Sequence, residues 1–421
     1  MSSSSMQSSL PNRWVLAVTA FIMQLALGSV YSWSVFLNPV IALYHVTRLQ
    51  ANLTFSIVLL ALGVTAGFGG YLNSRFGPRV IATLGGILYG LGVILATFVA
   101  PNIFLLYLTF GIIGGIGVGL GYIVALAMLI KWFPDRRGFI TGLAVAGFGA
   151  GALVTSPIAA SLIKSVGVGS TFLYLGITYL VVIVIVAQFF RTAPDGYAPA
   201  GWTPSARQQI NRSTREYILS EALRQPRWYV LWLMLALNVT AGAAVISVAS
   251  PMAQQFTGVG VVTAALLVSV IGIFNGAGRL FWGWLSDGIS RPFTFLSIFL
   301  IQAVVFAILP SVSSFAVLLI PVAIIALCYG GGFGTMPAFA ADFFGPKNAG
   351  TIYGVMLTAW SAGGIVGPIL ITSFGTTKNP DYATPLYIIA GIMLVSAALP
   401  LIARALARQQ GDVVEVPAGA T

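Results

Sequence analysis

Twelve long apolar segments dominate this chain of 421 residues. A helix needs roughly 20 largely apolar residues to cross about 30 Å of hydrocarbon, and only helices and closed barrels satisfy their backbone there. The segments of this length are residues 14–37, 52–72, 79–99, 103–130, 138–164, 169–190, 228–250, 261–284, 293–310, 315–341, 349–374 and 382–403. They predict an all-α membrane protein with twelve transmembrane helices.

The composition excludes two other classes of protein. Charged residues make up 7% of the chain and apolar residues 58%, whereas a soluble domain is typically about 25% charged. A soluble enzyme and a disordered protein are therefore both excluded. The net charge of +11 does not indicate a nucleic-acid partner, because the cations lie in short breaks between the apolar segments.

A polar, arginine-rich break separates the first six segments from the last six. We expect a disordered N-terminus at 1–13, a six-helix bundle at 14–190, a cytoplasmic linker at 191–227, a second six-helix bundle at 228–403 and a cytoplasmic tail at 404–421. Within the linker, Thr214–Arg224 is predicted to form a short amphipathic helix on the membrane surface. The first apolar segment has full span length and no convincing small-residue cleavage site, so we expect it to be retained as a helix.

The two halves carry signs of an internal duplication. Pro134, Gly138, Gly142 and Gly151 recur 212 residues later as Pro346, Gly350, Gly354 and Gly363. Two parallel halves joined by a linker are typical of carriers that rock about a site near the middle of the membrane.

The cations predict how the chain is oriented. If the N-terminus is inside, 16 of the 20 Lys and Arg residues lie on that side and only Arg48, Lys164 and Lys378 lie on the other. Positively charged loops stay in the cytoplasm, so we expect both termini to be cytoplasmic in the cell's inner membrane. The nine acids all fall outside the predicted spans, with Asp381 alone on the outer side.

The remaining cation, Arg279, lies inside a predicted span, in the sequence GIFNGAGRLFWGW. An arginine within a span costs at least about 2.5–3.5 kcal/mol unless it faces water or a partner. Asn275 precedes it by four residues and shares its helical face. A guanidinium binds a carboxylate through two parallel hydrogen bonds, which favours an anion site. The alternatives are a side chain that extends to the membrane interface or one that caps backbone carbonyls.

Two motifs resemble those of a known family. The segment GYLNSRFGPR at 70–79 is similar to the loop motif of the major facilitator superfamily, although Ser74 replaces the usual acid, and GWLSDGISR at 283–291 is a partial second copy. The segment WFPDRRGFITGLAVAGFGAG at 132–151 resembles the fifth-span signature of the monocarboxylate transporters, and Gly28–Trp33 is closer to the bacterial oxalate–formate exchangers. The resemblance implies two six-helix bundles and gating or motif roles for Gly70, Arg75, Gly77, Arg79, Asp287, Arg136, Arg137, Gly142, Gly147 and Gly151.

The same resemblance implies a binding site, because monocarboxylate carriers have their binding arginine in this span. The predicted substrate-binding residues are Arg279, Asn275, Tyr31, Tyr122, Tyr329, Phe333, Trp360 and Phe148. Each aromatic residue has helix packing as its alternative role. Trp360 stands where the oxalate exchanger has a lysine, so Arg279 would be the single cation of the site. One monocarboxylate neutralises such a site, whereas a dicarboxylate leaves a surplus charge that costs several kcal/mol.

These observations predict a secondary transporter of small monocarboxylates such as L-lactate or pyruvate, with proton symport implied by the resemblance. A carboxylate anion exchanger of the oxalate–formate type is the alternative. The family's usual acid four residues before the arginine is replaced by Asn275, so the candidates for proton coupling are His45, Asp381 and Lys378. For these three, incidental exposure in the outer loops is the competing interpretation.

Catalytic chemistry has no support in the sequence. With one His, one Cys and no Walker-type loop, the chain lacks a nucleophile–base pair, a metal ligand set and a phosphate loop. We expect no enzyme activity, no cofactor and no metal. The expected partners are a small carboxylate, a proton and the lipid bilayer, with the protein acting as a monomer.

Overall fold

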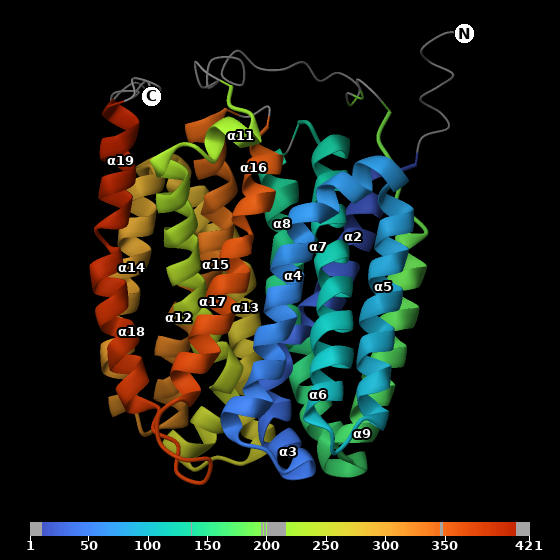
Figure 1. Ribbon diagram of the computed structural model, residues 1–421, viewed down its shortest axis with the longest axis vertical. Coiled ribbons are helices and arrows are strands. Elements are labelled where there is room, and N and C mark those ends of the chain that lie inside the picture. The colour runs from blue at the N-terminus through green and yellow to red at the C-terminus, as the bar shows by residue number, and fades with distance from the viewer. Residues whose placement is uncertain are drawn as a thin grey trace.

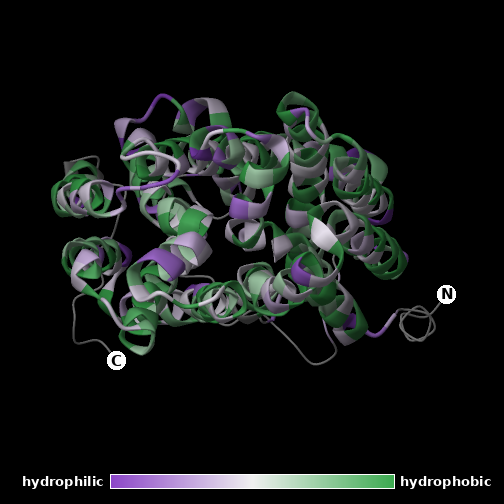
Figure 2. Cartoon of the chain, turned by 90° about the horizontal axis from the view of Figure 1, so that it is seen from below, coloured by the Kyte–Doolittle hydropathy of each residue, from purple (hydrophilic) through white to green (hydrophobic). Residues whose placement is uncertain are grey.

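The computed structural model describes residues 11–135, 137–194, 197, 199, 216–345 and 348–409. The side chains of Ser74, Arg137–Phe139, Thr141, Asp287 and 407–409 also lie outside the description. The described part is a bundle of long helices that run roughly parallel to one another (Figure 1). Hydrophobic residues predominate along these helices when the bundle is viewed end-on (Figure 2).

Eleven helical segments among the described residues are long and apolar enough to cross a membrane. One of them, Gly142–Ala187, has 46 residues, about twice the length that one crossing needs. Its helix is broken at Gly167, where φ is 81° and ψ is 168°. This segment therefore crosses twice, and the predicted fold of twelve transmembrane helices is confirmed.

The first half contains α2 (Arg13–Leu27), η1 (Gly28–Ser32), α3 (Trp33–Tyr44), α4 (Arg48–Phe76), α5 (Pro78–Leu95), η2 (Ala96–Phe98), α6 (Ile103–Leu106), η3 (Tyr107–Gly114), α7 (Gly115–Trp132), α8 (Arg137–Gly149) and α9 (Gly151–Ala187). The second half contains α11 (Leu219–Ala222), α12 (Pro226–Thr257), α13 (Val261–Ile289), α14 (Arg291–Ile308), η4 (Leu309–Ser311), α15 (Phe315–Phe344), α16 (Ala349–Met356), α17 (Thr358–Thr372), α18 (Ala383–Ser396) and α19 (Leu399–Gln409). We call the face where α2 begins and α19 ends the terminal face, and the face where α3 ends the opposite face (Figure 1).

Local sequence explains where the helices begin. The side chain of Asn12 accepts a hydrogen bond from the backbone of Trp14 at the start of α2. Thr47 and Gln50 form a capping box at the start of α4. Between α4 and α5, Gly77 takes a φ of 80° and Pro78 occupies the first helical position, which stops one helix and starts the next.

The duplication is visible in the helix boundaries. Helices α4 and α13 each have 29 residues, and α5 and α14 each have 18. Every boundary of α13 and α14 lies 213 residues after the corresponding boundary of α4 and α5. Ser290 even repeats the positive φ of Gly77, at 75° against 80°. The offset between these boundaries is one residue longer than the 212 residues that separate the repeated Pro and Gly positions later in each half.

The halves meet mainly where α4 packs on α17 and where α8 and α9 pack on α13. Helix α3 also contacts α12, and α4 contacts α16. The contact of α8 with α13 depends on missing side chains, because a Cβ on Gly149 would lie only 2.7 Å from the backbone nitrogen of Gly276. Small residues that let backbones approach closely are the usual means of packing helices in a membrane.

Three boundary predictions need correction. Of the predicted helix at Thr214–Arg224, the described structure holds only Leu219–Ala222, while 214 and 215 lie outside the description. The predicted disordered N-terminus overlaps α2, which begins at Arg13. Helices also run beyond the predicted spans, so Asp287 and Asp342 fall in the last turns of α13 and α15.

Candidate functional site

Arg279 lies deep inside the bundle, ten residues or about 15 Å before the end of α13. Its side chain is 1% exposed, so it does not extend to the membrane interface. Its Nε donates to Oδ1 of Asn275 at 3.3 Å, and its Nη1 donates to the carbonyl oxygen of Val145 at 3.0 Å. Capping of a backbone carbonyl, one of the alternatives from the sequence, therefore accounts for the Nη1 donor of Arg279.

Two buried donors at this point have no hydrogen-bond partner among the described residues. They are Nη2 of Arg279 and Nδ2 of Asn275. Buried polar groups in folded proteins are nearly always paired, so a pair of unsatisfied donors indicates a place for an acceptor. A carboxylate supplies two such oxygens.

Six aromatic side chains form a closed circuit of ring contacts beside the guanidinium, and Phe148 also contacts Trp360 across the circuit, with their ring centroids 5.5 Å apart. Successive ring centroids around it are 5.4 Å apart for Tyr31–Phe148, 5.1 Å for Phe148–Tyr122, 5.3 Å for Tyr122–Trp360, 4.5 Å for Trp360–Phe333, 5.4 Å for Phe333–Tyr329 and 5.9 Å for Tyr329–Tyr31. The structure thus brings together all six aromatic residues that the sequence singled out. We call this set the aromatic ring.

The aromatic ring draws three members from each half and holds Arg279 against its face. The guanidinium carbon lies 5.0 Å from the centroid of Phe333 and 5.8 Å from that of Phe148, within the range of cation–π attraction. No member is more than 1% exposed. In this conformation the site is therefore enclosed by both halves, and a solute reaches it only when they separate.

Hydrogen bonds tie the aromatic ring together across the halves. The hydroxyls of Tyr31 and Tyr329 are 2.8 Å apart, and Nε1 of Trp360 donates to the Tyr329 hydroxyl at 3.2 Å. The Tyr329 hydroxyl is thus a shared point of contact between η1, α15 and α17. Opening the site must break at least the bond between the two tyrosines.

Polar residues behind the aromatic ring were missed by the sequence analysis. Gln24 donates to the backbone carbonyl of Tyr122 at 3.0 Å, and Asn238 donates to that of Tyr329 at 3.2 Å, so each half holds one ring tyrosine with an amide from its first helix. Gln302 in turn donates to Asn238 at 2.8 Å. The available signal was the presence of uncharged amides inside apolar spans, which are costly unless paired.

The motif residues at 70–79 lie at the terminal face, whereas Gly147 directly precedes Phe148 of the aromatic ring. Gly142 packs against Leu280 of the other half, Gly147 faces α2, and Gly151 faces Gly28 of η1 and Leu25 of α2. Gly77 forms the turn between α4 and α5, and a Cβ on Gly70 would meet nothing within 4 Å. The guanidinium carbon of Arg75 lies 5.4 Å from the ring centroid of Phe76. The Nη2 of Arg79 is buried and has no hydrogen-bond partner among the described residues. Arg136 and the side chains of Arg137 and Asp287 lie outside the described residues, so their gating roles remain predictions.

The three candidates for proton coupling lie at the opposite face, whereas Arg279 lies within the bundle. His45 is exposed at the end of α3, and Lys378 is exposed in the loop after α17. Hydrogen bonds from the side chain and backbone of Thr384 lower the pKa of the Asp381 carboxyl below its ordinary value of 3.8. Asp381 is therefore ionised throughout the neutral range.

We predict that Asp381→Asn leaves the pH profile of transport unchanged. A carboxyl whose pKa is lowered is deprotonated well below about pH 5, so it exchanges no proton when uptake is measured between about pH 5 and 8. Initial uptake rates of the variant and the unaltered protein across this range provide the measurement. A shift in the midpoint of the profile would restore Asp381 as a proton carrier.

The contact that closes the opposite face centres on Arg48. Its side chain is 8% exposed, donates through Nη1 to the hydroxyl of Tyr382, and donates through Nη2 to the carbonyl oxygen of Thr377 at 3.0 Å. Nearby, Asn52 donates to Ser247 of the other half at 3.0 Å. We call the contact of Arg48 with Thr377 and Tyr382 the Arg48 latch.

We predict that Arg48→Ala shifts the protein toward conformations open at the opposite face. The latch is a buried charge-assisted contact between the halves, so its loss should favour opening by roughly tenfold. A cysteine introduced at Ser247 should react faster with a membrane-impermeant maleimide in the Arg48→Ala background. Lys378→Ala, which removes an exposed cation from the same loop, is the control and should leave the reaction rate unchanged.

Comparison with known proteins places this geometry in a family. Residues 14–368 match the Major Facilitator Superfamily. The chain is 33% identical over 362 residues to an uncharacterized MFS-type transporter, YhjX, of Escherichia coli (strain K12), covering 84% of this chain and 86% of that one. It is 30% identical over 375 residues to the oxalate:formate antiporter of Oxalobacter formigenes, covering 87% of each chain.

More distant similarities agree. Monocarboxylate transporter 11 of Homo sapiens is 27% identical over 407 residues, covering 91% of this chain and 81% of that one. Among solved structures, a bacterial homolog to the human lysosomal transporter Spinster superposes with a TM-score of 0.70 at 18% identity, covering 97% of this chain and 99% of the other, which supports the fold. The resemblance predicted from the motifs is confirmed: this chain is a multi-pass membrane transporter that belongs to the Major Facilitator Superfamily.

Proposed function

We propose that the protein is a secondary transporter of small monocarboxylates of the L-lactate and pyruvate type, with the carboxylate bound to Arg279. The observation that carries the proposal is the pair of unsatisfied buried donors, Nη2 of Arg279 and Nδ2 of Asn275, beside the aromatic ring. A carboxylate accepts from both donors, and the aromatic side chains surround its apolar end. The names of the oxalate:formate and monocarboxylate relatives support a carboxylate as the substrate class.

The charge of the site favours one carboxylate over two. Arg279 is the cation beside the aromatic ring, and all six ring members are uncharged. A bound monocarboxylate brings the site close to neutrality, while a dicarboxylate leaves a negative charge away from water at a cost of several kcal/mol. Neutralisation also lowers the cost of closing apolar walls, which couples binding to the enclosed conformation.

Transport follows from the way both halves build the site. The aromatic ring closes only when the halves meet, and separation at either face exposes Arg279 to that face. The Arg48 latch restricts access from the opposite face. We propose that the terminal face is cytoplasmic in the inner membrane, because the loops at that face carry most of the cations. The linker and tail at that face would then be cytoplasmic, and the two bundles would be the rocking units.

Proton symport and anion exchange are the two candidate couplings. The similarity to the oxalate:formate antiporter favours exchange. The single positive charge of Arg279, which one monocarboxylate neutralises, favours symport. Uptake of radiolabelled lactate, pyruvate, formate and oxalate into proteoliposomes distinguishes them. Accumulation driven by a pH gradient into vesicles without internal anion supports symport, and an absolute requirement for internal anion supports exchange. If none of these acids is taken up, the proposed function is wrong.

A further inference from the structure

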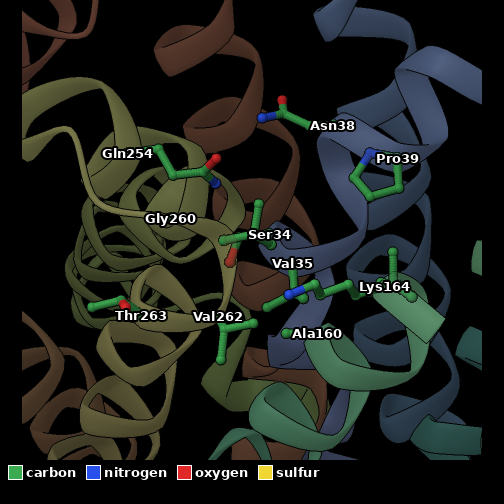
Figure 3. A pocket seen from close by; sticks show the side chains of 12 residues that line it. Ser34, Val35, Asn38, Pro39, Ala160, Lys164, Gln254, Gly260, Val262 and Thr263 are labelled. Carbon is green, nitrogen blue, oxygen red and sulfur yellow. The ribbon is translucent and has the colours of Figure 1, made fainter.

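A cavity lies between the halves at the opposite face. Its volume is about 510 Å³, and it is bounded by α3 and α9 of the first half and by α12 and α13 of the second (Figure 3). No member of the aromatic ring lines it. Ser34, which does, lies only three residues beyond Tyr31, so the cavity lies on the route from the opposite face toward Arg279. Its volume is in the usual range for small-molecule sites.

One of the lining residues is an exposed cation. Lys164 of α9 lines it, and its side chain extends into the space between the halves (Figure 3). The ion pairs recorded for the described residues, Arg13 with Asp135 and Arg291 with Asp342, do not involve Lys164. Of the other cations predicted on this face, Arg48 is engaged in its latch. The charge in the cavity is therefore available to a solute anion.

Uncharged polar groups converge on the same space. The amides of Asn38 and Gln254 point into the cavity from opposite halves (Figure 3). The Nε2 of Gln254 also donates to the backbone carbonyl and the hydroxyl of Ser250, each at 3.3 Å. Ser34 is 1% exposed, and its Oγ has no hydrogen-bond partner among the described residues. An unsatisfied buried hydroxyl that lines a cavity can donate a hydrogen bond to a ligand or a water molecule.

The rest of the lining is apolar. Val35, Pro39, Ile163 and Val262 supply aliphatic surface next to the ammonium group. An ammonium with neutral donors on an otherwise apolar wall matches a carboxylate that carries an apolar body, since the head is paired while the body leaves water. Phosphates and dicarboxylates fit this lining less well, because Lys164 is the only charged side chain among the residues that line it.

We propose that this cavity is a second carboxylate site, separate from Arg279, that binds monocarboxylates with an apolar body through Lys164. Its role as an entry site for the substrate rests on the proposed function, whereas binding itself does not. Anions that arrive from the opposite face are held there until the Arg48 latch opens. The site therefore raises the rate of loading from that face alone.

Binding is tested with benzoate, an aromatic monocarboxylate, by calorimetric titration of the purified full chain. The Arg279→Ala variant removes the central site and should retain one benzoate site. Adding Lys164→Gln should weaken that binding about tenfold or more, while adding Lys164→Arg should preserve it and show that the fold tolerates substitution. Lys378→Gln, which removes another exposed lysine that does not line the cavity, is the matched control and should have no effect.

Other outcomes are decisive. If Arg279→Ala binds no benzoate, or if Lys164→Gln leaves its binding unchanged, the second site is refuted. Transport gives an independent measurement: Lys164→Gln should raise KM severalfold for uptake from the opposite face and leave KM from the terminal face unchanged. If the unaltered protein transports no monocarboxylate but its benzoate binding still depends on Lys164, the proposed function fails and the second site stands.

Discussion

Arg279→Ala should reduce carboxylate uptake by at least a hundredfold and leave membrane insertion intact. Among the described residues, the guanidinium is the cation that contacts the aromatic ring, and without it a carboxylate would enter a low-dielectric site unpaired. Removal of this buried side chain leaves the carbonyl oxygen of Val145 without the hydrogen bond from Nη1. Membrane insertion should be unaffected because it depends on the apolar spans. Uptake of labelled lactate and pyruvate, normalised to the amount of monodisperse protein, is the measurement.

Arg279→Lys is the matched control for charge alone. Lysine keeps the positive charge but lacks the planar pair of donors, so partial uptake with a higher KM is expected. Full activity of Arg279→Ala would remove Arg279 from the binding site and with it the proposed cargo. Loss of monodisperse protein in both variants would instead assign Arg279 a structural role.

Trp360→Lys should change the preferred charge of the substrate. Trp360 contacts Tyr122, Phe148 and Phe333 within the aromatic ring, at centroid distances of 5.3, 5.5 and 4.5 Å. A lysine there adds a second cation next to Arg279, and the two together match a dicarboxylate. We expect oxalate uptake to appear and monocarboxylate uptake to fall about tenfold or more, since one carboxylate no longer neutralises the site.

Trp360→Met separates charge from shape in this experiment. Methionine opens the same space without a charge, so oxalate uptake should not appear. Competition between labelled lactate and unlabelled oxalate measures the change in preference for all three proteins. Oxalate uptake by the methionine variant would show that bulk at position 360, and not charge, excludes dicarboxylates.

The sequence singled out eight residues as a candidate binding site. Arg279 stood out because it was the only cation that the loops could not explain, and Asn275 followed from helical spacing. The six aromatic residues were named through the family resemblance, since aromatic residues alone, at 12% of the chain, gave no basis for choosing among them. The structure then brought all six into one closed ring.

The closure of the opposite face was not predicted. The sequence drew attention to Lys378 and Asp381, which are charged and share a loop. The structure instead uses Arg48 together with the hydroxyl of Tyr382 and the carbonyl of Thr377. Sequence reasoning looks for a partner of opposite charge, whereas a buried guanidinium is equally well satisfied by neutral acceptors that no charge pattern reveals.

The sequence by itself determined the crossings, the repeat and the presence of an unexplained buried cation, because hydropathy, helical spacing and residue offsets are properties of the chain alone. The tertiary structure decided which donors remain unsatisfied, that the aromatic ring closes, and that Lys164 lines a cavity. These features join side chains as far apart as Tyr31 and Tyr329, separated by 298 residues. Such contacts arise only from how two six-helix halves pack against each other, and no periodicity within either half encodes that packing.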